Sequence, residues 1–211
     1  MKKLILLITL SLLSGFVFSD KFLSESLKKK FRVFPFKGEY YYLKKSATKY
    51  VNGLIYPVPD IDFPFLGVHL TKTTNNEVEA GPNAILSFEK EGYTKFSFKW
   101  NDFFQIISWK GFWKFTRLFW KIGVYEYYRS FSKNEFTRSI KELVPDIKKK
   151  DLIIGKNGIR AQIMTNEGKL MDDFLVDKNN GIYNVINAPS PAATSSFAIA
   201  KNIINQIKKK T

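Results

Sequence analysis

The sequence has no cysteine and only one histidine, His69, in 211 residues. The absence of cysteine excludes disulfides, a thiol nucleophile and thiolate metal sites. A single histidine excludes a metal centre that takes several histidines from this chain. The sequence also has no G-x-G-x-x-G turn, no Walker A loop and no G-x-S-x-G motif. It therefore carries no phosphate-binding or serine-nucleophile signature of its own.

Aromatic residues and positive charge are abundant instead. The chain contains 20 Phe, 10 Tyr and 4 Trp, with a net charge of +15, so it is not a disordered tail. The charge permits nucleic acid, an anionic membrane surface or an acidic small molecule as partner. The lysines are scattered or lie in short runs, and the main segment that mixes basic with aromatic side chains is residues 112–121. We therefore expect solvated basic faces and no nucleic-acid partner.

Residues 1–19 begin with two lysines and continue with an apolar run from Leu4 to Leu13. This layout is typical of a secretory signal peptide, and the run is short for a membrane-spanning helix, which needs about 20 apolar residues. A competing interpretation is a buried strand that remains from the truncation of a longer protein.

The region from Phe31 to Ala80 has the composition of an antiparallel sheet. Leu66–Thr71 alternates between apolar and polar residues, and Asn75-Asn76 predicts a turn into a second arm at Glu77–Ala80. One face of this sheet is expected to be covered by the rest of the fold. His69 and Tyr56 are expected on the other face.

A helical region follows the sheet. Asn101 or Asp102 is a candidate cap for a first helix, and Ser132 with Glu135 forms an S-x-x-E capping box for a later one. Between them, residues 112–128 are aromatic on several sides, with basic residues interspersed. This segment suits a membrane surface, where Trp and Lys are favoured, or alternatively packs under the sheet or against a neighbour.

Strands return in Leu152–Leu175, with Asn157-Gly158 and Glu167-Gly168 as expected turns. Arg160 and Gln162 fall on one face of the predicted strand. An arginine in the middle of a strand is unusual unless it is paired or points into a polar site. The alternative is an arginine at a strand edge in water.

The C-terminal stretch Asn180–Ile207 predicts a strand at Ile182–Ile186 followed by a helix. Ser190 is a candidate N-cap, with Pro191 at the first helical position. One apolar face is expected from Phe197, Ala200, Ile203, Ile204 and Ile207. The free N–H groups at such a helix start suit an electron-rich ligand, although an ordinary strand–helix connection has the same pattern.

Seven short blocks, taken together and in order, resemble the L-2-hydroxyglutarate oxidase/dehydrogenase family. They span roughly Phe31 to Ile207: FKGEYYYL (36–43), GLIYPVPD (53–60), FPFLGVHLT (63–71), VEAGPNAIL (78–86), YRSFSK (128–133), GIRAQ (158–162) and NAPSPAAT (187–194). The family consists of FAD enzymes in the wider D-amino-acid-oxidase-like superfamily.

The resemblance implies an α+β fold with an antiparallel substrate-domain sheet and helices, plus the C-terminal strand and helix of an incomplete FAD-binding domain. The expected divisions are 1–19 as the signal-like or remnant segment, 20–178 as the substrate-domain-like region and 179–211 as the strand–helix piece. SGFVFSDK at Ser14–Lys21 is similar to a family strand end, which favours truncation over export.

The resemblance also implies a reaction and the residues for it. The reaction is oxidation of a 2-hydroxy acid, expected to be L-2-hydroxyglutarate giving 2-oxoglutarate, with hydride transfer to FAD. His69 is the expected catalytic base, while Arg160, Tyr56 and Gln162 are the expected substrate-binding residues. The expected flavin-contacting residues are Asn187, Ala188, Pro189, Ser190, Pro191, Ala192, Ala193 and Thr194.

The family's phosphate-binding G-x-G-x-x-G region is absent from this sequence. We therefore expect the chain alone to bind FAD poorly, and a separately encoded half is a conceivable partner. Oxygen and a membrane quinone are the two candidate electron acceptors. The alternative function is an inactive binding protein, exported or on a membrane surface, that keeps the substrate-domain sheet. The expected location is cytoplasmic or at the inner membrane, or outside the cell if residues 1–19 act as a signal.

Overall fold

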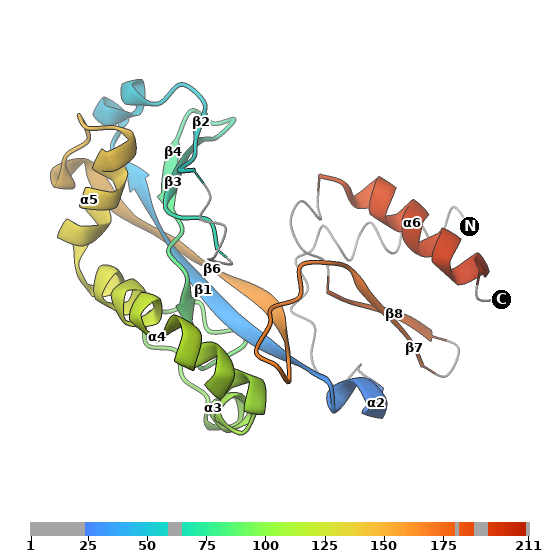
Figure 1. The fold of residues 1–211 in the computed structure, drawn as a ribbon. Helices are drawn as coiled ribbons and strands as arrows, with labels where there is room; N and C mark the ends of the chain where they lie inside the picture. The colour runs from blue at the N-terminus through green and yellow to red at the C-terminus, as the bar shows by residue number, and fades with distance from the viewer. Residues whose placement is uncertain (1–23, 59–64, 180–181, 188–193, 210–211) are drawn as a thin grey trace. The chain divides into compact units, whose positions relative to one another are not determined.

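The computed structural model describes residues 24–58, 65–179, 182–187 and 194–209 (Figure 1). The signal-like segment 1–19 lies outside this range. In chain order the elements are α2 (Glu25–Lys28), β1 (Phe31–Leu43), the 3₁₀ helix η2 (Lys45–Tyr50), β2 (Leu54–Ile55), β3 (His69–Lys72), β4 (Val78–Gly81), β5 (Ile85–Leu86), α3 (Trp100–Ile107), α4 (Lys110–Phe131), α5 (Lys133–Leu143), the 3₁₀ helix η3 (Lys149–Asp151), β6 (Leu152–Thr165), β7 (Leu175–Asn179), β8 (Ile182–Asn187) and α6 (Ser196–Lys209). The expected α+β class is confirmed.

The chain divides into two compact units, and each is described by itself. Unit 2 is Phe34–Arg160, and unit 1 comprises the described residues within Met1–Val33 and Ala161–Thr211. The domain divisions expected from the sequence, at 19/20 and 178/179, stay predictions.

The main sheet has the strand order β2-β3-β4-β1-β5, and β6 also pairs with β1. Strands β3 and β4 form the predicted hairpin, with His69 opposite Gly81 and Lys72 opposite Val78. Asn76, in the turn between them, has a φ of 61°, a left-handed conformation that asparagine tolerates better than most residues. The alternation of apolar residues thus correctly predicted which side chains of the hairpin share a face.

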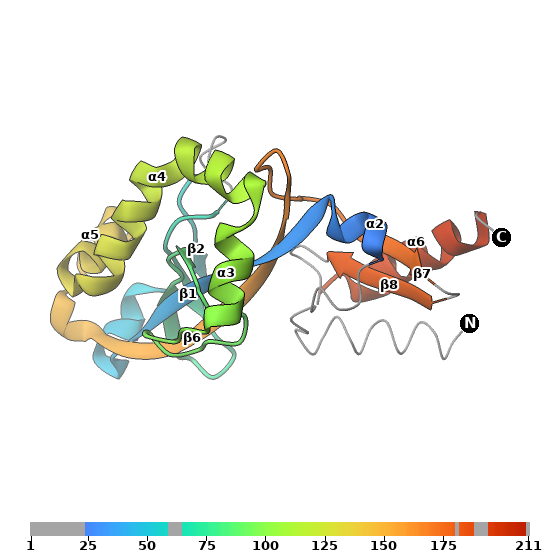
Figure 2. The same ribbon diagram turned by 90° about the horizontal axis from the view of Figure 1, so that it is seen from below.

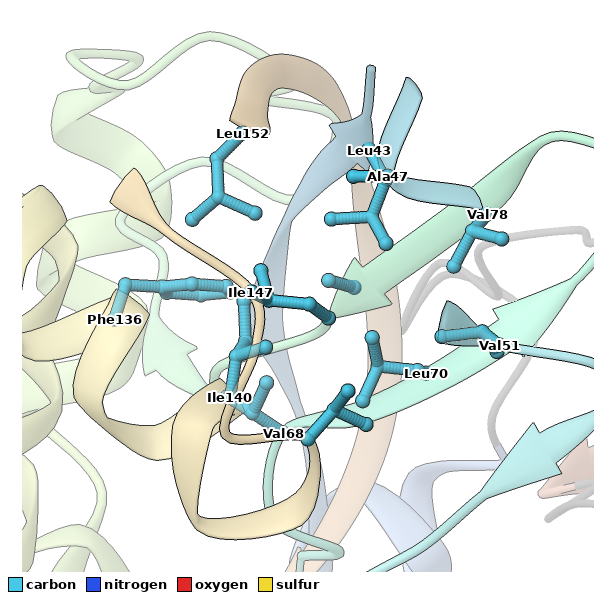
Figure 3. Close-up of a cluster of buried hydrophobic side chains, with 12 residues drawn as sticks. Leu43, Ala47, Val51, Val68, Leu70, Val78, Phe136, Ile140, Ile147 and Leu152 are labelled. Atoms are coloured by element: carbon cyan, nitrogen blue, oxygen red, sulfur yellow. The ribbon is translucent and has the colours of Figure 1, made fainter. Parts of the chain in front are cut away.

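Helix α5 covers one face of this sheet. Phe136 and Ile140 from α5 pack with Leu70 and Val78 from the hairpin in a cluster of buried side chains (Figure 3). The helix begins as predicted, because the Ser132 hydroxyl accepts a hydrogen bond from the Glu135 N–H at 3.3 Å, and it ends two residues before Pro145. One face of the hairpin is therefore buried under α5. The intervening residues along each strand point to the opposite face.

Helices α3 and α4 lie next to each other (Figure 2). The N-cap of helix α3 is Lys99, two or three residues before the predicted caps, and Asp102 instead lies buried in the first turn. Its carboxylate accepts a hydrogen bond from the Lys90 N–H at 3.0 Å. Among the described residues, no helix is both long and apolar enough to cross a membrane.

Strand β6 runs unbroken through Asn157-Gly158, so the turn predicted there is wrong. A Cβ atom on Gly155 would come within 2.8 Å of the Tyr40 carbonyl oxygen, which shows how closely the two backbones approach. The pairing of β6 with β1 outweighs the local turn propensity of Asn-Gly. The second predicted turn is confirmed at Gly168, with a φ of 81°.

Unit 1 contains the antiparallel pair β7–β8 and helix α6. Ile199 and Ile203 on α6 pack with Phe174, Val176, Val185 and Ile207. The helix begins at Ser196, later than the predicted start at Pro191; Ser190 and Pro191 lie outside the described residues. Phe197 lies within about 20° of the buried Ile204 around the helix axis, on the expected face, but it is 73% exposed.

Candidate functional site

His69 is the centre of the candidate site, on the face of the sheet away from α5. The neighbouring Leu70 is buried in the core under α5, so alternation turns His69 to the opposite face. The strand register continues from Ile55 opposite Leu70 to place Tyr56 beside His69. The two rings stack with 4.5 Å between centroids and 28° between planes. The structure thus brings together two of the residues singled out from the sequence.

One nitrogen of His69 is held by its own chain. Its Nδ1 atom lies 3.0 Å from the carbonyl oxygen of Gly67. A carbonyl oxygen can only accept a hydrogen bond, so Nδ1 must carry the proton that is donated. In the neutral imidazole this leaves a lone pair on Nε2. The ring is therefore oriented and held in the tautomer that a proton-accepting role requires.

Tyr40 is a third residue with an aromatic ring on this face, and sequence reasoning missed it. Tyr56, His69, Gly81 and Tyr40 lie side by side across neighbouring strands, and we call them the His69 row. On β1, the pairing of Tyr41 with Ala80 places Tyr40 beside Gly81, which is opposite His69 on β3. Burial, followed by the nearby Glu79 and Tyr56, raises the pKa of Tyr40. Its hydroxyl is thus kept as a neutral hydrogen-bond donor. Tyr40 was recognisable from the alternation Gly38, Tyr40, Tyr42 along the strand.

Gly81 makes the close packing of this row possible. Its φ is +145°, a conformation that L side chains rarely adopt. A Cβ atom there would stand 2.8 Å from the Glu39 carbonyl oxygen and 3.1 Å from the Tyr40 ring. Glycine is therefore required for both conformation and space.

Arg160, on β6, is exposed and lies over an aromatic ring. Its guanidinium carbon is 5.8 Å from the ring centroid of Phe65, and Phe65 in turn packs on Phe36, with 4.6 Å between centroids. A guanidinium over an aromatic face keeps its N–H donors directed sideways. The arginine therefore has a defined support on an aromatic face at the surface of unit 2.

Gln162 and Asn187, two more candidate residues, belong to unit 1 and are buried. The side-chain amide of Gln162 donates to the Met171 carbonyl at 2.7 Å. The amide of Asn187 donates to the carbonyls of Met171 at 3.1 Å and Asp173 at 2.7 Å. Both side chains thus anchor the connection before β7, and Asn187 fixes the end of β8. Their expected roles in substrate and flavin contact stay predictions.

The segment expected to approach the flavin lies almost wholly outside the described residues. Ala188, Pro189, Ser190, Pro191, Ala192 and Ala193 are in this undescribed part, and Thr194, the last residue of the segment, is exposed. The described residues fit FAD only in part, because they include no glycine-rich turn that could cradle a pyrophosphate. Nor do they include a cluster of three or more His, Cys, Asp or Glu residues that could hold a metal ion.

A second polar cluster lies on the helix side of the sheet, and sequence reasoning missed it too. Glu39 and Asn83 exchange two hydrogen bonds, from the Glu39 N–H at 2.7 Å and from the Asn83 amide at 3.0 Å. Glu126 on α4 accepts from the Ala84 N–H at 3.0 Å and from Arg129 at 2.6 Å. All four side chains are buried. These hydrogen bonds hold the loop after Gly81 against both β1 and α4. They therefore stabilise the end of β4, where Gly81 lies beside His69.

Two further groups complete this polar interior. Burial lowers the pKa of Lys37, and its ammonium donates to the carbonyls of Thr94 at 3.1 Å and Lys95 at 2.9 Å. Burial, followed by the charge of Glu39, raises the pKa of Tyr127 to about 12, and the Tyr127 hydroxyl donates to the Leu86 carbonyl. The alternation of Lys37, Glu39 and Tyr41 on one strand face was the available sequence signal.

Comparison with known proteins places the chain in a family. The family model described as "FAD dependent oxidoreductase" matches residues 17–206. The L-2-hydroxyglutarate dehydrogenase of Indibacter alkaliphilus is 47% identical over 189 residues, which cover 89% of this chain and 47% of that protein. The mitochondrial enzyme of Homo sapiens is 39% identical over 184 residues, covering 85% of this chain and 40% of that protein. The resemblance identified from the sequence is thereby confirmed.

A solved structure is also similar in fold. The dithionite-reduced L-alpha-glycerophosphate oxidase from Mycoplasma pneumoniae with FAD bound matches with a TM-score of 0.53 and 16% identity, covering 82% of this chain and 36% of that one. The chain spans less than half the length of the relatives named above. Because the family model covers most of its residues, this chain belongs to the family of FAD dependent oxidoreductases.

Proposed function

We propose that this chain supplies the substrate-binding part of an FAD-dependent oxidoreductase that converts L-2-hydroxyglutarate to 2-oxoglutarate. The observation that carries the proposal is the state of His69, whose Nδ1–H is fixed on the Gly67 carbonyl so that Nε2 can accept a proton. The family and the substrate named for its relatives supply the reaction class. The chemistry that FAD supplies when bound is acceptance of a hydride.

In this proposal His69 removes the proton from the substrate hydroxyl. The unprotonated Nε2 of an imidazole can take a proton from a bound alcohol and later return it to solvent. The stacked ring of Tyr56 limits rotation of the imidazole, and the Tyr56 hydroxyl donates a hydrogen bond to the substrate. Tyr40 is a further neutral donor in the same row.

Arg160 in this proposal binds a carboxylate of the substrate. L-2-hydroxyglutarate carries two carboxylates, and a planar guanidinium can donate two parallel hydrogen bonds to one of them. The stacking on Phe65 orients the plane of the guanidinium. Gln162 and Asn187 stabilise the connection before β7 in unit 1, next to the predicted flavin-contacting segment.

The test uses this chain in two forms. One is the full chain with added FAD, and the other is a hybrid in which the chain replaces the matching region of the Indibacter alkaliphilus relative. Oxidation of L-2-hydroxyglutarate is followed by reduction of an artificial electron acceptor. In the hybrid, His69→Gln should lower kcat by about a hundredfold or more. Arg160→Gln should raise KM by about tenfold or more, because a charge-assisted hydrogen-bond pair is lost.

The matched control is Arg138→Gln, an exposed arginine on α5 whose guanidinium pairs with Glu135 at 2.8 Å. This variant carries the same change of charge and should leave KM within about twofold of the unchanged hybrid. An active hybrid in which His69→Gln and Arg160→Gln both behave like Arg138→Gln would refute the proposed roles. A folded, FAD-loaded hybrid that does not oxidise the substrate would refute the proposed reaction.

A further inference from the structure

Gly158 is a glycine in the interior of strand β6, and its backbone conformation does not require one. The strand is unbroken at this position. A glycine there weakens the strand, because it loses more backbone freedom on folding and has no side chain to pack. The glycines with positive φ in the described residues are Gly81 and Gly168, so any L residue could adopt the conformation of Gly158.

Packing within the described residues does not require a glycine at this position either. Apart from its chain neighbours, a Cβ atom on Gly158 would have one described neighbour within 4 Å, the Cε2 atom of Tyr40 at 3.9 Å. That distance is an ordinary van der Waals contact. Gly155 on the same strand differs, since its Cβ would stand 2.8 Å from the Tyr40 carbonyl oxygen. The close approach of β1 therefore explains Gly155 but not Gly158.

The open space at Gly158 lies on the face of the sheet that carries the candidate site. Gly158 precedes Arg160 by two residues, so both positions turn to the same face of β6. The ring that a Cβ on Gly158 would touch belongs to Tyr40, a member of the His69 row. Gly158 thus lies on the surface that joins the His69 row to Arg160.

We infer that the substrate lies against the backbone of β6 at Gly158, so that this glycine limits the size of the acid that the site accepts. The inference rests on the proposed function for the identity of the substrate and for the role of Arg160. With one carboxylate bound by Arg160, the rest of the acid extends across Gly158 toward the His69 row. A glycine inside a strand often marks such a close approach of a ligand to the backbone.

The first measurement is urea denaturation of the full chain, which separates this function from a structural one. Gly158→Ala should keep the midpoint of the unchanged chain or raise it, because alanine loses less backbone freedom on folding. Gly155→Ala should lower the midpoint, because its Cβ has no room beside the Tyr40 carbonyl. The two variants make the same chemical change on one strand.

The second measurement is isothermal titration calorimetry on the FAD-loaded hybrid described above. The probe is 2-oxoglutarate, which has the carbon chain of the proposed substrate and cannot be oxidised in this reaction. Gly158→Ala should raise Kd by about threefold, and Gly158→Val by about tenfold or more, because each added methyl group enters the space of the ligand. Steady-state kinetics should show a parallel rise in KM for L-2-hydroxyglutarate.

Gly53→Val is the matched control for binding. No described atom lies within 4 Å of a Cβ on Gly53, so the added side chain should leave Kd within about twofold of the unchanged hybrid. Circular dichroism of each variant establishes that it is folded before its Kd is compared.

The inference is overturned if both Gly158 variants bind 2-oxoglutarate as well as Gly53→Val does, or if the unchanged hybrid does not bind it. It is also overturned if Gly158→Ala lowers the urea midpoint as much as Gly155→Ala, since the protein itself would then fill the space. Failure of the proposed function gives a different result. A hybrid whose binding depends on Gly158 but that does not oxidise L-2-hydroxyglutarate would refute the reaction and leave the binding position intact.

Discussion

The Tyr56 ring stacks on the His69 imidazole, and the Nδ1–H of the same imidazole is bound to the Gly67 carbonyl. Two different contacts therefore orient one ring, one on its face and one on its edge. An oriented base loses less entropy when it meets its substrate. Tyr56 consequently has two separable functions in the proposed site, to support the imidazole and to donate a hydrogen bond.

Substitutions at Tyr56 should separate these functions in the hybrid enzyme. Tyr56→Phe keeps the stacking and removes the hydroxyl, so KM should rise by about fivefold to tenfold while kcat changes little. Tyr56→Leu removes both and should also lower kcat by about tenfold. Steady-state kinetics with L-2-hydroxyglutarate measure the two effects. Equal kinetics in all three enzymes would contradict both functions.

Gly81→Ala should destabilise unit 2 and disturb the His69 row. The added Cβ would stand 2.8 Å from the Glu39 carbonyl oxygen, in a backbone with φ of +145°. We expect a loss of about 2 kcal/mol or more in the free energy of unfolding, measured by urea denaturation. Gly53→Ala is the control, because no atom lies within 4 Å of the added Cβ. A stability equal to that of the control would show that the strand relaxes freely.

Glu126→Gln should be strongly destabilising although it is nearly isosteric. It leaves the Arg129 guanidinium buried without its anion and weakens the acceptor for the Ala84 N–H. Removal of one partner from a buried ion pair costs about 3–5 kcal/mol. Glu142→Gln, an exposed acid on α5, should change stability by less than about 0.5 kcal/mol. Urea denaturation at neutral pH distinguishes the two, and similar midpoints would contradict the structural role of the pair.

Tyr127→Phe should reduce the loss in free energy of unfolding that the protein undergoes at alkaline pH. Burial raises the pKa of Tyr127 to about 12 from an ordinary value of 10.0, so the folded state holds this proton more tightly than the unfolded state. Its contribution is complete below pH 10 and is lost as the pH rises through about 12, amounting to about 2–3 kcal/mol. Denaturation of both proteins at about pH 8 and about pH 11 should show the smaller decline in Tyr127→Phe. Parallel declines would show that Tyr127 does not titrate in this way.

The isolated chain should retain little FAD. No G-x-G-x-x-G turn is encoded in it, and that turn with its helix N-terminus supplies most contacts to the pyrophosphate. Gel filtration after incubation with FAD, followed by the flavin absorbance of the protein peak, measures retention. The hybrid with the Indibacter alkaliphilus relative is the positive control. Stoichiometric flavin on the isolated chain would refute this prediction.

Local patterns predicted those parts of the fold that local interactions determine. The β3–β4 hairpin followed from the alternation around Leu70 and from Asn76 in the turn. The start of α5 followed from Ser132 and Glu135, whose capping bond is local. In both cases the residues that carry the signal also make the contact. His69 and Tyr56 were correctly expected on one face for the same reason.

Longer-range interactions account for what the sequence did not predict. The Asn157-Gly158 turn was wrong because pairing with β1 holds β6 extended. The buried cluster of Glu39, Asn83, Glu126 and Arg129 joins residues more than 40 positions apart, and each of them alone resembles a surface residue. The support of Arg160 by Phe65 likewise joins distant residues.

The inward placement of Glu126 and Arg129 divides helix α4 into two sets of positions that can vary separately. The inner set is constrained by the buried ion pair and by the Ala84 N–H bound to it. The outer set, which includes the exposed Trp113, Lys114, Trp120 and Lys121, contributes little to that packing. Selection can therefore change the outer face without a loss of folding. Homologues of this chain should accordingly differ more in the outer set than in the inner one.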